Sequence, residues 1–205
     1  TTINDTYSVT TSFANAPEAT LYGFELEAQK YFPLDNLSAS PFFQSRRLVL
    51  IGNYTFTKSK LKVGEGDTTI PYTYTTGDLP AASDYFIDGA PMTGQSDHLV
   101  NFQIGLEDTD KLSQQTLLLT YASDRVTSRG PNLQPDIVER PGLTLDFVAL
   151  QGVVMPGGIN AEIKLEARNI TGRKYQEFQE AGGTRVYYNR YKLGTSVAGS
   201  VTVAF

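Results

Sequence analysis

The sequence predicts an all-β protein whose strands form an antiparallel β-barrel of the kind that crosses a membrane. The strongest support comes from residues 159–168, where Ile, Ala, Ile, Leu and Ala alternate with Asn, Glu, Lys, Glu and Arg. Successive side chains of a strand point to opposite faces, so this period of two places an apolar row on one face and a charged row on the other. The spacing of the turns is the second observation, and no segment shows a convincing helical period.

The same alternation recurs along the rest of the chain and predicts roughly eight strands in all. The other segments that show it are residues 6–13, 22–29, 48–57, 100–107, 116–122, 143–150 and 193–205. Leu118, Val148 and Leu150 break the pattern, because each adds an apolar residue to an otherwise polar row.

The connections between these strands alternate in length. Residues 155–158 (Met-Pro-Gly-Gly) and 108–111 are short turns, whereas long loops are expected at 58–97, 124–142 and 171–190. Short turns on one side and long loops on the other are typical of outer-membrane barrels. The connection from Pro33 to Gln44 is the exception, since it is long for its side. This arrangement places Phe205 at the periplasmic rim and the long loops outside.

Composition excludes several classes of function. The 205-residue chain has a formal net charge of -5 and no Cys, so a disulfide framework and a thiolate metal site are excluded and nucleic acid is not an expected partner. The longest apolar run is four residues, as at 48–51. A membrane-spanning helix needs about 20 predominantly apolar residues, so none is expected.

No catalytic or metal-binding constellation is expected, so the chain is predicted not to be an enzyme and to need no cofactor. His98 is the only histidine, and it follows Ser96 and Asp97. Neighbours in an extended strand point to opposite faces, so this adjacency does not make a triad. Asp108 and Asp110 offer too few oxygens for calcium, which takes about six to eight.

Several segments together resemble the C-terminal third of bacterial TonB-dependent receptors, and the sequences of the middle segments are most like those of alphaproteobacterial members. They are NAPEATLYGFELE at 15–27, NYTFTKS at 53–59, GQSDHLVN at 94–101, RNITGRKY at 168–175 and the terminal Phe205. The first contains an A-x-x-x-G-x-E pattern and the fourth an N-[IL]-[TF]-x-x-K-Y pattern. The chain departs from the family at Ser200, since glycine is usual five residues before the terminal aromatic.

The resemblance implies that residues 1–205 are the last eight strands of a plugged barrel of about 22 strands. Its plug and N-terminal strands would then lie outside this sequence, in the same protein or another chain. The implied partners are those strands and the plug, the TonB system through the plug, outer-membrane lipid and a small-molecule nutrient. Charged residues of the inward rows are expected to pair with one another or with the plug. These residues are Glu25, Glu27, Glu107, Asp146, Glu162, Lys164, Glu166 and Arg168.

The implied function is active uptake of a scarce nutrient, such as a siderophore, a vitamin or a saccharide, across the bacterial outer membrane. Arginine and tyrosine are enriched where proteins bind ligands, through forked hydrogen bonds and stacking. The candidate ligand-binding residues in the outer loops are Arg125, Arg129, Arg140, Arg173, Tyr175, Arg185 and Tyr187.

Two other readings of the same strands remain open. A self-contained eight-stranded membrane barrel would act as an anchor or adhesin, and its first and last strands would pair directly. A soluble β-sandwich that binds carbohydrate would bury the apolar rows between two sheets. An outer-membrane hydrolase is a more distant alternative.

Overall fold

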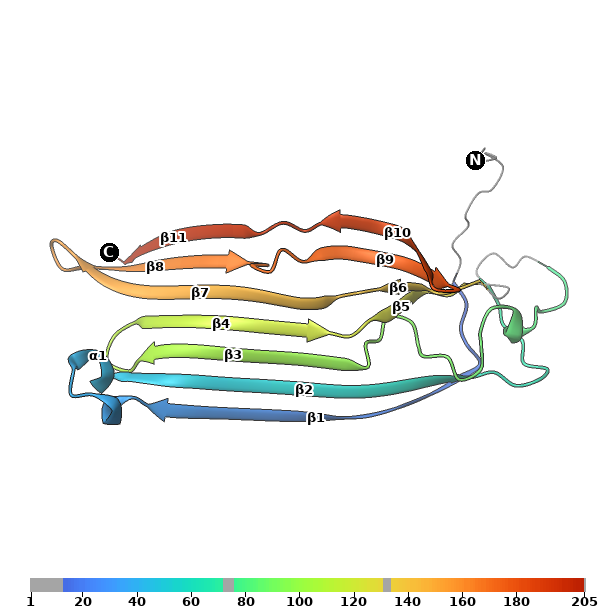
Figure 1. Cartoon of the computed structure of the whole chain (residues 1–205), viewed down its shortest axis with the longest axis horizontal. Helices are drawn as coiled ribbons and strands as arrows, with labels where there is room; N and C mark the ends of the chain where they lie inside the picture. The colour runs from blue at the N-terminus through green and yellow to red at the C-terminus, as the bar shows by residue number, and fades with distance from the viewer. Residues whose placement is uncertain (1–12, 72–75, 131–133, 205) are drawn as a thin grey trace.

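The computed structural model of the chain describes residues 13–71, 76–130 and 134–204 (Figure 1). Seven strands form one antiparallel sheet in the order β1-β2-β3-β4-β7-β8-β11. Their bounds are Glu18–Pro33 (β1), Arg46–Lys62 (β2), His98–Asp108 (β3), Ser113–Ala122 (β4), Gly142–Met155 (β7), Ile159–Arg168 (β8) and Ser196–Ala204 (β11). This architecture confirms the predicted all-β, antiparallel class.

A second, four-stranded sheet prolongs the first. Its strands are Arg125–Ser128 (β5), Ile137–Glu139 (β6), Lys174–Ala181 (β9) and Thr184–Lys192 (β10), in the order β10-β9-β6-β5. Each follows or precedes one strand of the larger sheet after a break of a few residues, so β4, β7, β8 and β11 continue as β5, β6, β9 and β10. The two sheets therefore keep the same strand order, and Figure 1 shows the smaller one at the end away from the C-terminus.

The smaller sheet corrects the predicted loops at 124–142 and 171–190, which are hairpins. Gly182 and Gly183, with φ of 56° and 75°, form the two-residue turn between β9 and β10. Both central residues of a type I′ hairpin turn need positive φ, so this glycine pair predicts a hairpin. The loop expected at 58–97 also begins later, because β2 continues to Lys62.

The short connections lie at the opposite end, as predicted. β7 and β8 are joined through a turn at Pro156–Gly158, and β3 and β4 are joined at 109–112. The longer connection from β1 to β2 folds into two single turns, the 3-10 helix Asp35–Leu37 (η1) and the helix Pro41–Gln44 (α1). No helix within the described ranges is long and apolar enough to cross a membrane.

The register of the larger sheet gathers the apolar positions on one face. Leu50 pairs with Ile104, Ile104 with Leu117, and Leu117 with Phe147, and the row continues through Ala167 to Val197. The adjacent rows lie on the other face and are mainly polar. One of them contains Glu27, Asn53, Asn101, Thr120 and Thr144.

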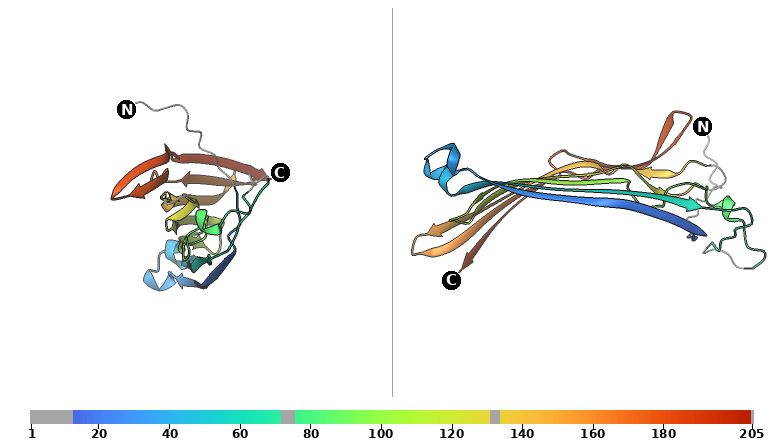
Figure 2. Two further views of the ribbon diagram at one scale, coloured as in Figure 1. Left: turned by 90° about the vertical axis from the view of Figure 1, so that its right-hand side faces the viewer. Right: turned by 90° about the horizontal axis from the view of Figure 1, so that it is seen from below.

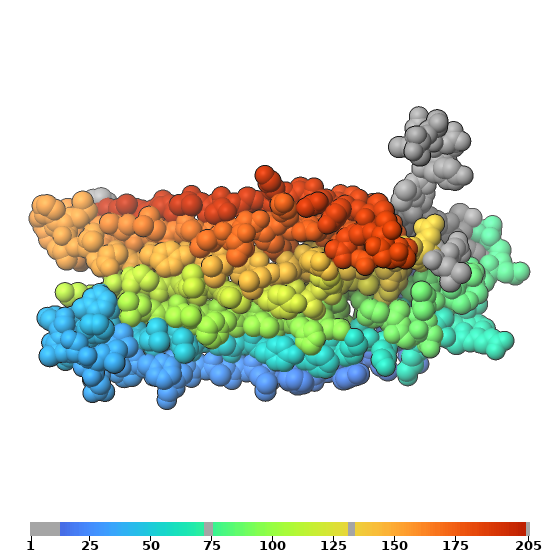
Figure 3. Space-filling model, viewed as in Figure 1, coloured from blue at the N-terminus to red at the C-terminus, as the bar shows by residue number. Residues whose placement is uncertain are grey.

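The apolar face is exposed. Leu26, Leu165 and Val201 retain 60%, 54% and 64% of their accessible surface. Described residues place no second sheet over the seven strands, and Figure 3 shows the strands following one another without an overlying element on the side turned to the viewer. The aliphatic side chains of this face are therefore not packed between two sheets.

The sheet is curved and open (Figure 2). In the described part of the chain, β1 pairs only with β2 and β11 pairs only with β8, so these two strands are free edges. Of the eight predicted strands, seven are present. The eighth, at residues 6–13, lies outside the described residues except for Phe13, which is not in a strand.

Asn169 ties the two sheets together where β8 ends. Its φ of 53° is in the left-handed region, which asparagine tolerates better than most residues. Its backbone N–H donates to Asp146 Oδ1 at 2.8 Å, and its Oδ1 accepts from the Arg173 N–H at 2.9 Å. Its Nδ2 donates to the Gly194 carbonyl at 2.7 Å, and the Thr195 hydroxyl donates to its carbonyl at 2.9 Å. Asn169 therefore connects β7, the residue that precedes β9 and the segment that leads into β11.

Two substitutions of Asn169 distinguish the contribution of its side-chain hydrogen bonds from that of its left-handed backbone conformation. Asn169→Gly keeps the left-handed conformation but loses the amide bonds, so we expect the free energy of unfolding to fall by about 1–3 kcal/mol. Asn169→Ala should cost about 1–2 kcal/mol more, because a Cβ disfavours that conformation. Denaturant unfolding followed by tyrosine fluorescence measures both. If the glycine variant is as stable as the parent, the amide bonds do not hold the sheets together.

Candidate functional site

The exposed apolar face has charged and aromatic borders. On β2 it extends from Leu48 to Phe56, with Arg46 at one end and Lys58 at the other. Arg46 pairs with Asp108 at 3.5 Å, and Lys58 pairs with Asp97 at 2.5 Å. The Arg46 guanidinium also lies 4.0 Å from the Phe42 ring centroid. The face is therefore an apolar belt that ends in neutralised charges on both sides.

Aromatic rings cluster at the border toward the long loops. Phe24 lies 5.9 Å from Tyr54 and 5.6 Å from Phe56, measured between ring centroids. His98 stacks on Tyr54 at 6.1 Å, and its Nδ1 shares a 2.9 Å hydrogen bond with the Tyr54 hydroxyl. The single histidine is thus the first residue of β3 and belongs to an aromatic band.

The predicted charged rows lie on the polar face, and several of their members pair with one another. Arg47 bonds Glu107 at 2.9 Å, and Arg168 bridges Asp146 and Glu166, each at 3.3 Å. Lys164 also pairs with Glu166. Glu25 accepts a 2.9 Å hydrogen bond from the Thr55 hydroxyl.

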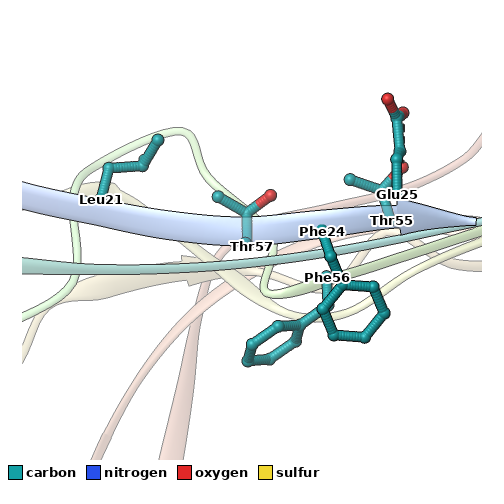
Figure 4. Close-up of a pocket in the computed structure, with 7 residues that line it drawn as sticks. Leu21, Phe24, Glu25, Thr55, Phe56 and Thr57 are labelled. Atoms are coloured by element: carbon teal, nitrogen blue, oxygen red, sulfur yellow. Dashed lines mark hydrogen bonds between the residues drawn. The ribbon is translucent and has the colours of Figure 1, made fainter.

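The A-x-x-x-G-x-E motif lies beside an open hollow of about 330 Å³ between β1 and β2. Figure 4 shows Phe24 and Phe56 on one side of the strands, and Leu21, Thr57, Glu25 and Thr55 on the other. A Cβ at Gly23 would lie 2.2 Å from the backbone oxygen of Phe56. Gly23 therefore allows an approach of the two strands that no other residue permits.

The four-stranded sheet brings together residues of the two hairpins and separates them by face. On the first face, Glu139 of β6 pairs in register with Glu177 of β9, and they are only 5% and 9% exposed. Arg125 bonds Glu139 at 2.7 Å, and Arg173 approaches it at 3.7 Å. The amide of Asn189 donates to Glu177 at 2.8 Å. The two buried carboxylates are therefore adjacent, and each has its own partners: arginines for Glu139 and an asparagine amide for Glu177.

Tyr175 lies on the first face and is hydrogen-bonded to the Glu177 carboxylate. Tyr175 stacks on Tyr191 at 4.9 Å, and its hydroxyl donates to Glu177. Burial, followed by that bond to the carboxylate, raises the pKa of Tyr175 to about 12. Burial by itself would raise the pKa of Glu177, but hydrogen bonds from Asn189, Tyr175 and Thr127 together lower it below the ordinary value.

Phe178 is the centre of the second face and is 4% exposed. The guanidinium of Arg185 lies 4.0 Å from its ring centroid and that of Arg140 lies 5.3 Å away. Tyr187 meets it edge-on at 6.3 Å. Arg140 holds Asp124 through three hydrogen bonds of 2.7 to 3.1 Å, and Arg185 holds Glu180 at 2.6 Å.

The seven sequence-predicted binding residues therefore do not form one cluster. Arg125, Arg173 and Tyr175 lie on the first face, whereas Arg140, Arg185 and Tyr187 surround Phe178 on the second. Arg129 is at the end of β5, where it pairs with Asp136 at 2.5 Å. All five arginines of the set are paired with carboxylates.

The predicted set of ligand-binding residues does not include four residues that organise these faces. They are Glu139, Glu177, Phe178 and Asn189. The alternation of residues 174–181 contained a signal, because Tyr175, Glu177 and Gln179 fall on one face and Gln176, Phe178 and Glu180 on the other. The sequence predicts a loop at 171–190, so this alternation does not enter the predicted strands.

Comparisons of the chain with protein-family models, curated proteins and solved structures give no match. Within residues 13–71, 76–130 and 134–204, no group of three or more His, Cys, Asp or Glu side chains could hold a metal ion.

The raised pKa of Tyr175 predicts a loss of stability at high pH. An unfolded tyrosine ionises near pH 10, whereas folded Tyr175 keeps its proton to about pH 12. Its contribution is fully present below pH 10 and is lost as pH rises through 12, by no more than about 3 kcal/mol.

The free energy of unfolding, measured from pH 9 to pH 12, should therefore fall less steeply in Tyr175→Phe than in the parent. The matched control is Tyr188→Phe, an exposed tyrosine on β10. Equal pH dependence of the parent and Tyr175→Phe would contradict the assignment.

Proposed function

We propose that this chain forms part of the barrel of a TonB-dependent outer-membrane receptor that takes up a scarce nutrient. The observation that carries the proposal is the apolar belt, a continuous and exposed face that crosses all seven strands of the larger sheet. In water, an apolar face of this extent has no reason to be exposed. In lipid, it is the expected outer surface of a barrel.

The height of the belt fits a bilayer. Nine residues of β2, Leu48 to Phe56, extend about 30 Å at the usual rise of a strand, and tilt reduces this to about the 25 Å of an outer-membrane barrel's apolar band. Aromatic rings at the border, such as Tyr54 and Phe56, correspond to the girdle at a lipid–water interface. The paired charges Arg46 and Lys58 lie just beyond it.

The open edges favour a part of a large barrel over the alternatives. Among the described residues, the outer edges of β1 and β11 have no strand partner. In lipid, the N–H and C=O groups of these edges would be unsatisfied, so further strands should continue the sheet on both sides. A β-sandwich would need a second sheet over the apolar face, which the described residues do not provide. A self-contained small barrel remains the second candidate, and it requires residues 6–13 to pair with β11.

The polar face then lines the interior, where its charge pairs are wet and can face a plug. The smaller sheet lies beyond the belt, on the side of the long loops, and carries both arginine–carboxylate pairs and aromatic rings. Since those arginines are neutralised, the site suits a ligand with polar groups and a flat or ring-shaped part rather than a strongly anionic one. Siderophores, vitamins and saccharides all meet this description.

A charge on the belt tests whether it faces lipid. Val201 is 64% exposed on the apolar face of β11, and Ala198 is exposed on the polar face of the same strand, opposite Glu166. Val201→Lys should make the free energy of folding into outer-membrane vesicles less favourable by about 2–4 kcal/mol, whereas Ala198→Lys should leave it nearly unchanged. The measurement is the folded, heat-modifiable fraction. If Val201→Lys folds as well as Ala198→Lys does, the belt does not face lipid.

The second face of the hairpins tests the ligand assignment. Cells that carry Arg140→Ala or Arg185→Ala should take up the nutrient less well, with each true contact contributing about 1–2 kcal/mol to binding. Uptake and binding are measured with a ferric siderophore, a vitamin and an oligosaccharide. Arg47→Ala, at the opposite end of the sheet, is the control. If both hairpin variants keep full affinity for the probe that the parent binds, the ligand site lies elsewhere in the receptor.

A further inference from the structure

Two lysines face each other across the β9–β10 hairpin. Lys174 and Lys192 are Cα partners in its register, so their side chains leave the same face at neighbouring positions. Like charges directly opposite each other on a sheet are destabilising. Lys192 is exposed and Lys174 is half-buried. No described carboxylate forms an ion pair with either ammonium group.

The next row on this face adds two more donors. Gln176 and Arg190 are partners in the same register, two positions from the lysine pair. The Arg190 guanidinium lies 4.6 Å from the Tyr187 ring centroid. The ring is an uncharged partner, and no described carboxylate forms an ion pair with Arg190. These four neighbouring positions of one face, the donor square, carry three cationic side chains and one amide.

Two carboxylates of the hairpin region are already engaged with other residues. Glu180 bonds Arg185, and Asp124 is held by Arg140, whose backbone N–H donates to the Gln176 carbonyl. Every other arginine of the two hairpins has a carboxylate partner. The positive charge of Lys174, Arg190 and Lys192 is therefore local and uncompensated within the described chain.

We propose that Lys174, Gln176, Arg190 and Lys192 form a phosphate-binding site. A phosphoryl group carries about −1.5 to −2 charges near neutral pH and presents three acceptor oxygens. The phosphoryl oxygens can accept hydrogen bonds from the three cationic side chains and from the amide of Gln176. Binding then replaces the repulsion between the two lysines with charge-assisted hydrogen bonds. The phosphate belongs either to a soluble ion or metabolite or to a lipid headgroup. This site does not depend on the proposed nutrient uptake.

Binding is tested with the purified protein in a non-ionic detergent. Inorganic phosphate and a short-chain phosphatidic acid are titrated separately by calorimetry, with a short-chain phosphatidylcholine as the neutral comparison. Binding of inorganic phosphate identifies a soluble source, and binding of phosphatidic acid only identifies a lipid headgroup. Either result supports the site. If neither probe binds more tightly than phosphatidylcholine, the proposal is overturned.

Variants locate the binding. Lys174→Gln and Lys192→Gln should each lower the affinity for the probe by roughly tenfold, because a charge-assisted hydrogen bond is lost. The control, Arg168→Gln, removes a guanidinium at the end of β8 that is already paired with Asp146 and Glu166, so affinity should change by less than about threefold. Equal weakening by all three variants would indicate a diffuse charge effect and would contradict a built site.

A second measurement separates binding from folding. Without a phosphate probe, Lys192→Gln should unfold at a higher denaturant concentration than the parent, because the like-charge pair is relieved. Adding the probe that binds should stabilise the parent more than the variant and reverse this order. A variant that is less stable than the parent without any probe would show that Lys192 makes favourable contacts of its own, and would overturn the proposal.

Discussion

The backbone register of the seven-stranded sheet is the constraint on which the rest of the structure depends. Because side chains alternate with a period of two, a one-residue slip of any strand would move its apolar row to the polar face. Pairs such as Leu50–Ile104 and Phe147–Ala167 place the apolar residues of neighbouring strands side by side on one face, from β2 to β8. The apolar belt is therefore a property of the pairing and not of any single strand, and its borders coincide across strands for the same reason.

The break between the two sheets releases the hairpins from this constraint. Asn169, Gly142, Gly172 and Gly194 all have positive φ and lie at or beside the points where the chain passes from one sheet to the other. Such residues let each strand turn without strain and resume pairing in the same order. The smaller sheet can then carry polar and charged side chains on both faces, beyond the end of the apolar belt.

Charge is distributed differently on the two sheets. On the larger one, the border cations Arg46 and Lys58 and the polar-face residue Arg168 all have carboxylate partners. The smaller one combines fully compensated arginines around Phe178 and Glu139 with one uncompensated square at Lys174 and Lys192. Repulsion that the fold does not cancel internally is the kind of feature that binding to an external group can offset. This contrast distinguishes the square from the structural ion pairs near it.

Local sequence patterns are enough to establish the all-β, antiparallel class and the two faces of the sheet. Alternation in segments such as 159–168 depends only on the geometry of a strand, and the short turns at 155–158 and 108–111 follow from local residue types. Leu118, Val148 and Leu150 looked like exceptions, and the register places all three on the polar face. Only the tertiary structure showed that the long segments at 124–142 and 171–190 pair with each other. It also divided the predicted arginines between two faces and brought Lys174 opposite Lys192. These features depend on which strand lies beside which, and on a bulge between Tyr187 and Asn189 that shifts the register by one residue. Contacts between residues far apart in the chain have no local sequence signal, because backbone hydrogen bonds can form between any two strands, and only the packing of the whole sheet selects the pairs that do.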